Sequence, residues 1–324
     1  MRPEQLTGKK ILYGCLDWGN GHVARSVPLI RQLLGQGNEI TLWCSEKQRT
    51  VFESFGLNIA YHTGFETDFT FTGDGNFRKE LLRNALRFLR AISSERKAAE
   101  VFAKSQGIDL IISDHRYGLR STEIASVFVT HQVKLPPGSG IGAQAIHHHW
   151  MSRFETTWIM DAGHTRLAGE LSEPAANSSY IGHYSRFAGL PEIPLEPKSV
   201  VVIISGPEPY AEFFYRLTVD LARHTSGNWK FVCSADYRNI QHDFPVINNW
   251  RLADEAIRSA EYIVSRNGYS TLMDLQFLGK KAVLVPTPGQ SEQQYLAEKH
   301  AGHLLWKIAK NEEEFAGLLL ELLR

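Results

Sequence analysis

The chain has 324 residues, which is long for one hydrophobic core and suits two domains of ordinary size. It carries 35 basic and 35 acidic residues, and this balance gives no electrostatic footprint for nucleic acid. Its three cysteines lie far apart in apolar segments, which indicates buried thiols in a reducing compartment. No apolar run reaches a membrane-spanning length, and the first one is too short for a signal peptide, so we expect a cytoplasmic protein.

The first half of the chain alternates short apolar runs with segments of helical spacing. An apolar run at 10–16 is followed by a glycine-rich turn at 17–22 and by apolar residues at helical spacing over 23–34. Further strands are expected at 39–44, 58–62, 108–113, 127–130 and 157–161, the last closing the first sheet, and further helices at 46–55 and 77–104. Such alternation predicts parallel strands covered by helices, which is the doubly wound α/β architecture.

The glycine-rich turn supports two functional interpretations. Gly19, Gly21 and Ala24 satisfy the dinucleotide pattern G-x-G-x-x-A, with Glu46 as a candidate ribose ligand, as in a dehydrogenase. His22 in the same turn has an ordinary pKa near neutral pH, which suits a general base, although a histidine beside a loop often serves only in packing. Asp114 follows the strand at 108–113, at the sheet edge where such domains bind ligands, and is the second candidate base.

Three other stretches of this half could bear on function: a polar loop, a basic helix and a run of histidines. Residues 63–76 break the alternation with glycines and polar residues and predict a mobile loop. The helix at 77–104 carries arginines on one side, among them Arg87 and Arg90, which indicates either contact with anionic lipid or a phosphate-bearing acceptor, or an ordinary solvated face. The consecutive histidines at 147–149 point in different directions on a helix, so no metal site is expected there.

The second half repeats the alternation after a segment at 162–176 that is rich in small residues and proline. Strands are expected at 200–205, 229–234, 246–248, 261–265 and 282–286, and helices at 270–278 and 312–323. The chain is therefore expected to build two α/β sheets of similar construction.

Residues 265–295 combine several features of a nucleotide-sugar site. Gly268 ends the strand before it, and the helix start that follows offers unpaired N–H groups and a positive dipole end to a diphosphate. Asp274 lies about one turn further on, where a carboxylate can accept two sugar hydroxyls, although Thr271 and Asp274 also fit a helix-capping pattern. A loop after 282–286 is expected to end in Gln293 and Gln294, whose amides both donate and accept hydrogen bonds.

These residues, Ser265-Arg-Asn-Gly268, Asp274, Val285-Pro286 and Gln293-Gln-Tyr295, resemble the donor half of family 28 glycosyltransferases, which include the N-acetylglucosaminyltransferases of peptidoglycan-precursor synthesis. Three earlier segments are also similar to the family: Gly21-His-x-x-Arg25, His131-Gln132 and Gly182-x-x-x-Arg186. The resemblance implies the GT-B fold, an α/β fold in which two Rossmann-like doubly wound domains face each other across a cleft.

The resemblance also implies roles for individual residues. Asp274 would bind the ribose, and the paired glutamines would contact the donor sugar. The complete expected donor site contains Arg186, Gly206, Arg266, Asn267, Gly268, Ser270, Thr271, Asp274, Gln293 and Gln294; the acceptor-side loop contains Gly19, Gly21 and His131; and the catalytic candidates are His22 and Asp114. The chain departs from the family after Gly206, because Pro207 and Pro209 replace a glycine-serine-rich diphosphate loop and each lacks an amide donor.

We therefore expect an acceptor-side domain at 1–176, a donor domain at 177–310, and a C-terminal helix at 311–324 that packs back on the first domain. The expected activity is inverting, metal-independent transfer of a sugar from a UDP-type donor to an unknown carbohydrate or lipid-linked acceptor. The sequence contains no Asp-x-Asp motif of the kind that holds Mg²⁺, and no cofactor is expected.

Three alternative functions stay open: a UDP-sugar hydrolase or epimerase, a non-catalytic nucleotide-sugar binding protein, and the dehydrogenase. Peripheral contact with the inner membrane face is expected through 77–104.

Overall fold

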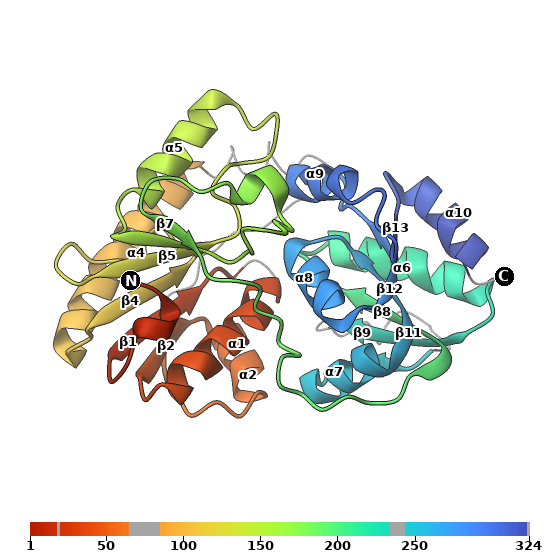
Figure 1. Ribbon diagram of the computed structural model, residues 1–324, viewed down its shortest axis with the longest axis horizontal. Helices are drawn as coiled ribbons and strands as arrows, with labels where there is room; N and C mark the ends of the chain where they lie inside the picture. The colour runs from red at the N-terminus through yellow and green to blue at the C-terminus, as the bar shows by residue number, and fades with distance from the viewer. Residues whose placement is uncertain (18–19, 65–84, 234–243, 323–324) are drawn as a thin grey trace. The chain divides into compact units, whose positions relative to one another are not determined.

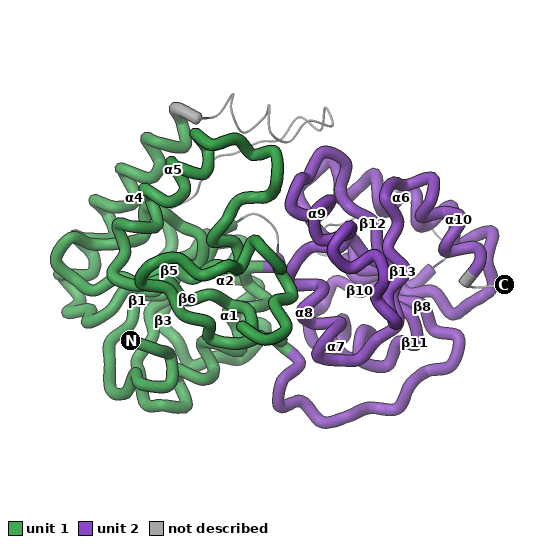
Figure 2. Tube along the Cα trace, turned by 45° about the horizontal axis from the view of Figure 1, so that its top comes forward, with its two compact units in different colours: residues 1–18, 22–70, 81–186 green, residues 19–21, 71–80, 187–324 purple. Residues whose placement is uncertain are grey.

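The computed structural model describes residues 1–17, 20–64, 85–233 and 244–322 (Figure 1). The chain separates into two compact units, which Figure 2 shows in different colours. Unit 1 comprises residues 1–18, 22–70 and 81–186, and unit 2 comprises 19–21, 71–80 and 187–324. The division after residue 186 replaces the boundary that the sequence predicted after residue 176. The predicted loop at 63–76 and the first residues of the predicted helix at 77–104 fall largely outside the described residues.

Unit 1 contains a seven-stranded parallel sheet in the order β3-β2-β1-β4-β5-β6-β7. Its strands are β1 (Lys10–Cys15), β2 (Glu39–Cys44), β3 (Ala60–Thr63), β4 (Leu110–Asp114), β5 (Ser126–Thr130), β6 (Thr156–Ile159) and β7 (Ser178–Tyr180). Its helices are α1 (Gly21–Gly35), α2 (Glu46–Glu53), α4 (Ala85–Gln106) and α5 (Ile141–Met151), with 3₁₀ turns at η1 (Pro3–Gln5) and η2 (Gly169–Ser172). The predicted strands are confirmed, but β6 does not close the sheet.

The edge strand β7 explains why the predicted domain boundary was wrong. Ile159 of β6 pairs with Tyr180 of β7, so the chain is still part of the first sheet at residue 180. β7 is only three residues long and two of them are serines, so it has no apolar run that would mark a buried strand.

Helices cover both faces of the first sheet because its strands are apolar on both sides. Leu12 of β1 packs with Ala99 and Ala103 of α4. The next residue, Tyr13, points to the opposite face, where its hydroxyl donates to Ser26 of α1 at 2.9 Å. Ligand-binding residues are therefore expected at the carboxyl ends of the strands, which the helices leave open.

Helix α4 combines an exposed basic side with a buried ion pair. Arg87 and Arg90 are exposed, as the sequence predicted for the residues that the structure describes. On the inner side, Glu95 is buried and accepts from Nε of Arg116 at 2.6 Å, which ties the helix to the segment after β4. None of the helices in the described ranges is both long and apolar enough to cross a membrane. Contact of this helix with lipid stays a prediction.

Asp161 anchors the segment that leads from β6 to the end of unit 1. Its carboxylate is fully buried and accepts from the backbone N–H groups of Ala162, Leu167 and Ala168 at 2.8, 2.9 and 3.0 Å. His183 donates from Nε2 to the same carboxylate at 2.8 Å. Burial alone would raise the pKa of Asp161, but these donors outweigh it and lower the pKa to about 2.

Replacing Asp161 with asparagine is expected to lower the free energy of unfolding at pH 7 by about 2.5 kcal/mol, which corresponds to a pKa depressed by about two units from its unfolded value near 3.9. A depressed pKa stabilises the fold above the unfolded pKa, and this contribution is lost as the pH falls from about 4 to about 2. The difference between the two proteins in denaturant titrations should therefore shrink across that window. Asp220→Asn, an exposed aspartate on α6, is the control, and a pH-independent difference would contradict the assignment.

Unit 2 contains a six-stranded parallel sheet in the order β10-β9-β8-β11-β12-β13. Its strands are β8 (Glu196–Ile204), β9 (Asn228–Cys233), β10 (Val246–Ile247), β11 (Ala260–Arg266), β12 (Lys281–Val285) and β13 (Trp306–Ile308). Its helices are α6 (Tyr210–Arg223), α7 (Trp250–Ser259), α8 (Tyr269–Leu278), α9 (Ser291–Lys299) and α10 (Glu312–Leu322). The sequence did not predict α6, α7, α9 or β13, but two doubly wound α/β sheets are confirmed.

Helices α6 and α10 share one face of the second sheet. Val200 and Val202 of β8 line this face and pack with Phe214 of α6 and with Phe315 and Leu319 of α10. The buried side chains of α10 thus belong to the core of unit 2. The prediction that this helix returns to the first domain is corrected accordingly.

Candidate functional site

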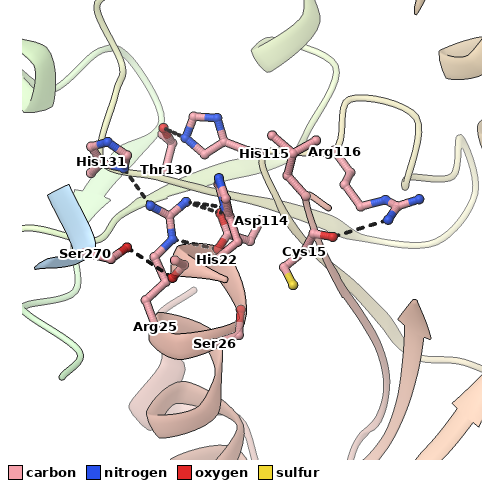
Figure 3. A network of polar contacts seen from close by, with 12 residues as sticks. Cys15, His22, Arg25, Ser26, Asp114, His115, Arg116, Thr130, His131 and Ser270 are labelled. Carbon is pink, nitrogen blue, oxygen red and sulfur yellow. Dashed lines mark hydrogen bonds and ion pairs between the residues drawn. The ribbon is translucent and has the colours of Figure 1, made fainter. Parts of the chain in front are cut away.

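Four polar side chains converge at the carboxyl end of the first sheet (Figure 3). Strands β1, β4 and β5 are neighbours and parallel, so the segments that follow them meet at one edge. His22 and Arg25 come from the first turns of α1, Asp114 ends β4, and His131 directly follows β5. The structure therefore brings together the two predicted catalytic residues and the predicted acceptor-side histidine.

Arg25 lies at the centre of this cluster, with its side chain 2% exposed. Its Nε donates to Oδ2 of Asp114 at 2.8 Å, and its Nη2 donates to Oδ1 of the same carboxylate. Its Nη1 and Nη2 lie 2.8 Å from Nδ1 of His131 and Nδ1 of His22. A bidentate arginine–carboxylate pair with two further imidazole contacts fixes the geometry of all four groups.

Asp114 is not suited to accept a proton from a substrate. Burial alone would raise the pKa of its carboxyl, but the Arg25 guanidinium outweighs this and holds the pKa well below its usual range. Its side chain is 0% exposed and both oxygens are engaged. We therefore withdraw Asp114 as a general base and assign it to orienting its neighbours.

His22 is the more accessible member of the cluster, with a side chain 16% exposed. Burial lowers the pKa of its imidazole, the Arg25 charge lowers it further, and the Asp114 carboxylate raises it. The ring is therefore neutral at neutral pH. A neutral imidazole beside a carboxylate can exchange protons with a hydroxyl group, as the predicted base role requires.

Two further histidines complete the surroundings. His115 follows Asp114 with a φ of +60°, a left-handed backbone conformation that is strained for a residue with a side chain. Its Nε2 lies 2.6 Å from the Thr130 hydroxyl. Burial lowers its pKa well below the ordinary value. His131 is 5% exposed and contacts Arg25, and its predicted place in the acceptor-side loop stays a proposal.

The predicted dinucleotide pattern is only partly described. Gly21 is the first residue of α1, whereas Gly19 lies outside the described residues. Glu46, the candidate ribose ligand of a dehydrogenase, is the first residue of α2 rather than the end of a strand. Its side chain is 66% exposed and lies 3.9 Å from Arg49. These features do not favour the dehydrogenase.

A pocket of about 640 Å³ opens beside the loop that carries His131. The loop after β5 and the first turns of α5 line it, through Leu135, Pro136, Ile141 and Ala145 among others. Gln144 holds this loop by accepting from the Leu135 N–H at 2.7 Å. His147 on the same helix is buried between the Tyr117 hydroxyl at 2.5 Å and the Gln132 carbonyl at 2.8 Å, so its role is structural.

The predicted donor residues of unit 2 also gather at one sheet edge. Strands β8, β11 and β12 are neighbours, and each is followed by a predicted segment, which begins at Gly206, Asn267 and Thr287 respectively. Gly206 has a φ of +110°, which favours glycine at the turn after β8. Helix α8 begins at Tyr269 after the N-cap Gly268, and no side chain caps it. Its first N–H groups thus point toward the carboxyl edge of the sheet, as anion binding requires.

Asp274 lies in the second turn of α8 and is 8% exposed. Because Gly268 is the N-cap, Thr271 is already inside the helix and Asp274 is beyond the first turn. The alternative that these two residues form a capping box is therefore wrong. Ribose binding by Asp274 stays a prediction, which the geometry permits.

The paired glutamines lie on the first turn of α9 and not in a loop. Gln293 is buried, and its Oε1 accepts from the Thr287 N–H at 2.7 Å. Asn267 donates from Nδ2 to the Gln293 carbonyl at 2.6 Å. The Asn267 Oδ1 is fully buried and has no hydrogen-bond partner among the described residues. Gln294 is exposed, because neighbours on a helix point about 100° apart.

Arg266 does not serve the donor site in the way that the sequence predicted. It is 3% exposed, donates to the Pro286 carbonyl at 2.9 Å and to Glu312 at 2.8 Å, and lies over the Phe214 ring. Burial lowers its pKa, while Glu312 raises it. These contacts fasten α10 to the sheet, so we assign Arg266 a structural role. Arg186, at the end of unit 1, is half-buried and keeps its predicted role as a proposal.

Comparisons with known proteins agree with this construction. Residues 223–323 match the glycosyltransferase family 28 C-terminal domain. The solved glycosyltransferase of kitacinnamycin is similar with a TM-score of 0.65 and 15% identity, covering 98% of this chain and 91% of that chain. The spinosyn rhamnosyltransferase SpnG complexed with thymidine diphosphate matches with a TM-score of 0.65 and 14% identity, covering 97% of this chain and 91% of that chain. MurG of Acinetobacter baumannii matches with a TM-score of 0.56 and 14% identity, covering 98% of this chain and 91% of that chain.

At such identities the structural likeness establishes the fold, while the family match identifies the C-terminal domain. The comparison with curated protein sequences finds no match. Both parallel sheets, with their polar residues at the carboxyl edges, fit this assignment. Residues 223–323 of this chain thus form a glycosyltransferase family 28 C-terminal domain, and the chain as a whole has the GT-B fold.

Proposed function

We propose that this enzyme transfers a sugar from a nucleoside-diphosphate donor of the UDP type to an acceptor hydroxyl, with inversion and without a metal ion. The donor assignment rests on the groups that lie together at the carboxyl edge of the second sheet. These are the uncapped start of α8, the buried Asp274 and the Asn267–Gln293 pair. N–H groups suit a diphosphate, a carboxylate suits ribose hydroxyls, and amides suit a sugar.

The proposed reaction is a single displacement. The acceptor oxygen forms a bond to the anomeric carbon while the bond from that carbon to the diphosphate oxygen breaks. The nucleoside diphosphate leaves with the electron pair, and the N–H groups at the start of α8, together with Arg186, stabilise its charge. His22 takes the proton of the acceptor hydroxyl. The proposal requires that an acceptor held by unit 1 reaches the sugar held by unit 2.

The pocket beside α5 supports an acceptor with an apolar part. Leu135, Pro136, Ile141 and Ala145 line it, and the loop that forms it continues from His131. A lipid-linked or otherwise apolar acceptor fits this lining better than a fully polar oligosaccharide.

A thermal-shift screen over UDP, TDP, their sugar conjugates and NADH tests the donor assignment, because a ligand that binds the folded protein raises its melting temperature. We expect uridine nucleotides to raise it most. Thymidine nucleotides are the closest competitor, since a structural neighbour is complexed with thymidine diphosphate. A response to NADH alone would contradict the proposal.

Turnover separates transfer from the alternatives that use the same donor pocket. With a nucleotide sugar alone, a hydrolase releases free sugar and an epimerase yields a second nucleotide sugar. The proposed transferase should release nucleoside diphosphate at a substantial rate only when an acceptor is added. Binding without turnover over a broad acceptor panel would instead support a non-catalytic nucleotide-sugar binding protein.

A further inference from the structure

The Nη2 group of Arg25 has two hydrogens and two close neighbours (Figure 3). One neighbour is Oδ1 of Asp114, and the other is Nδ1 of His22 at 2.8 Å. A guanidinium group stays protonated in proteins and can only donate hydrogen bonds. Each neighbour of Nη2 is therefore an acceptor.

The acceptor role of the His22 Nδ1 determines which ring nitrogen carries the proton. Nδ1 also lies 3.2 Å from Oδ1 of Asp114, which would permit a hydrogen bond in the opposite sense, from His22 to Asp114. That distance is longer than the 2.8 Å to Arg25, and a proton on Nδ1 would face the Nη2 hydrogen directly. Oδ1 of Asp114 and Nδ1 of His22 lie near each other because both accept from the same NH₂ group of Arg25.

We propose that Arg25 is a positioning residue that selects the tautomer of His22 with its proton on Nε2. Arg25 is well placed to enforce this choice because the rest of its guanidinium is fixed. Nε donates to Asp114 and Nη1 to His131, each at 2.8 Å. Turning Arg25 away would leave the buried Asp114 carboxylate without its counter-charge, which is costly.

Among the described residues, no other charged group faces His22 that would favour the tautomer with its proton on Nδ1. The titratable groups facing it are Arg25 on α1, Asp114 and His115 at the end of β4, and His131 after β5. The His115 ring lies 5.4 Å from the His22 ring, edge to face, and its pKa is lowered, so it is neutral at neutral pH.

The selected tautomer has a consequence for catalysis, which rests on the proposed function. A base that accepts a proton at Nε2 needs a lone pair there, and then Nδ1 carries the proton and donates to Asp114. The contact of Arg25 with Nδ1 must open before His22 reaches this form. Arg25 thus controls how much of the enzyme has a base-competent His22.

Nitrogen NMR of the whole protein, labelled with ¹⁵N, tests the tautomer directly. Long-range ¹H–¹⁵N spectra above the pKa of His22 distinguish protonated from bare ring nitrogens, and His22→Gln identifies the signals. We expect Nδ1 to be bare and Nε2 to be protonated. In Arg25→Gln the proton should move to Nδ1, whereas Arg31→Gln, a half-buried arginine on the same helix, should change nothing.

A protonated Nδ1 in the wild-type protein would overturn the proposal, and so would an unchanged tautomer in a folded Arg25→Gln variant. The wild-type spectrum alone is decisive if that variant does not fold. Activity gives a second readout: the acid limb of the kcat profile should move to higher pH in Arg25→Gln, because the charge that opposes protonation of His22 is gone while Asp114 remains. The spectra need no substrate, so the two proposals can fail separately. If Nδ1 is bare but the protein has no transferase activity, the proposed function is contradicted and the proposed tautomer is supported.

Discussion

His22→Ala is expected to reduce kcat by about 10²- to 10⁴-fold, the usual contribution of a general base. The dissociation constant for the donor nucleotide should stay unchanged, because the proposed donor residues other than Arg186 belong to unit 2, whereas His22 belongs to unit 1. Steady-state kinetics with saturating acceptor, combined with calorimetric titration of the nucleotide, measures both quantities.

The control for His22 is His164→Ala, an exposed histidine of the same unit. It should leave both kcat and nucleotide binding as they are. Unchanged turnover in His22→Ala would remove this residue from the reaction. A loss of nucleotide binding together with turnover would mean that the substitution acts through the fold, since His22 contacts both Arg25 and Asp114.

Asp274→Ala is expected to weaken binding of UDP on the order of 100-fold or more. A carboxylate that accepts two ribose hydroxyls forms two charge-assisted hydrogen bonds, each contributing about 1.5–3 kcal/mol. Because the ribose is common to donor and product, the affinity for UDP and for UDP-sugar should fall together. Competition binding with a fluorescent nucleotide measures this change.

The matched control is Gln276→Ala, an exposed residue two positions further along α8. It should bind UDP as the wild type does. Full affinity in a folded Asp274→Ala variant would show that the carboxylate has another task in α8, and the ribose assignment would be wrong.

The sequence predicted the architecture well because both sheets are parallel and buried. Their strands form compact apolar runs between turn residues, as at 39–44, which matches β2 in full. Elements without such a run were missed. The edge strand β7 has two serines, and α9 begins with polar residues directly after a turn that contains Pro288 and Gly289, so it was taken for a loop.

The candidate site was predicted in outline, but its contacts were not. The expected positions at the carboxyl ends of strands follow from topology alone, which is why His22, Asp114 and His131 converge as predicted. Arg25 was visible only as the end of the Gly-His-x-x-Arg segment. Its bonds to residues of β4 and the loop after β5 depend on pairing across the sheet, which no local pattern encodes.

Arg266 shows the opposite error. Its place in the Ser-Arg-Asn-Gly segment suggested a ligand for the diphosphate, yet the side chain turns into the unit and bonds to Pro286 and Glu312. Residue type and spacing locate a basic side chain near a site, but burial decides whether it faces the ligand. The side-chain oxygen of its neighbour Asn267 is buried and has no hydrogen-bond partner among the described residues. Asn267 is therefore the stronger candidate for a contact with the donor.

A crystal structure of the protein with UDP bound is the most direct test of the central claim. The diphosphate should lie against the first N–H groups of α8, and the ribose hydroxyls should lie within hydrogen-bond distance of the Asp274 carboxylate. Density for the nucleotide at the carboxyl edge of the first sheet, or no binding at saturating concentration, would contradict the account.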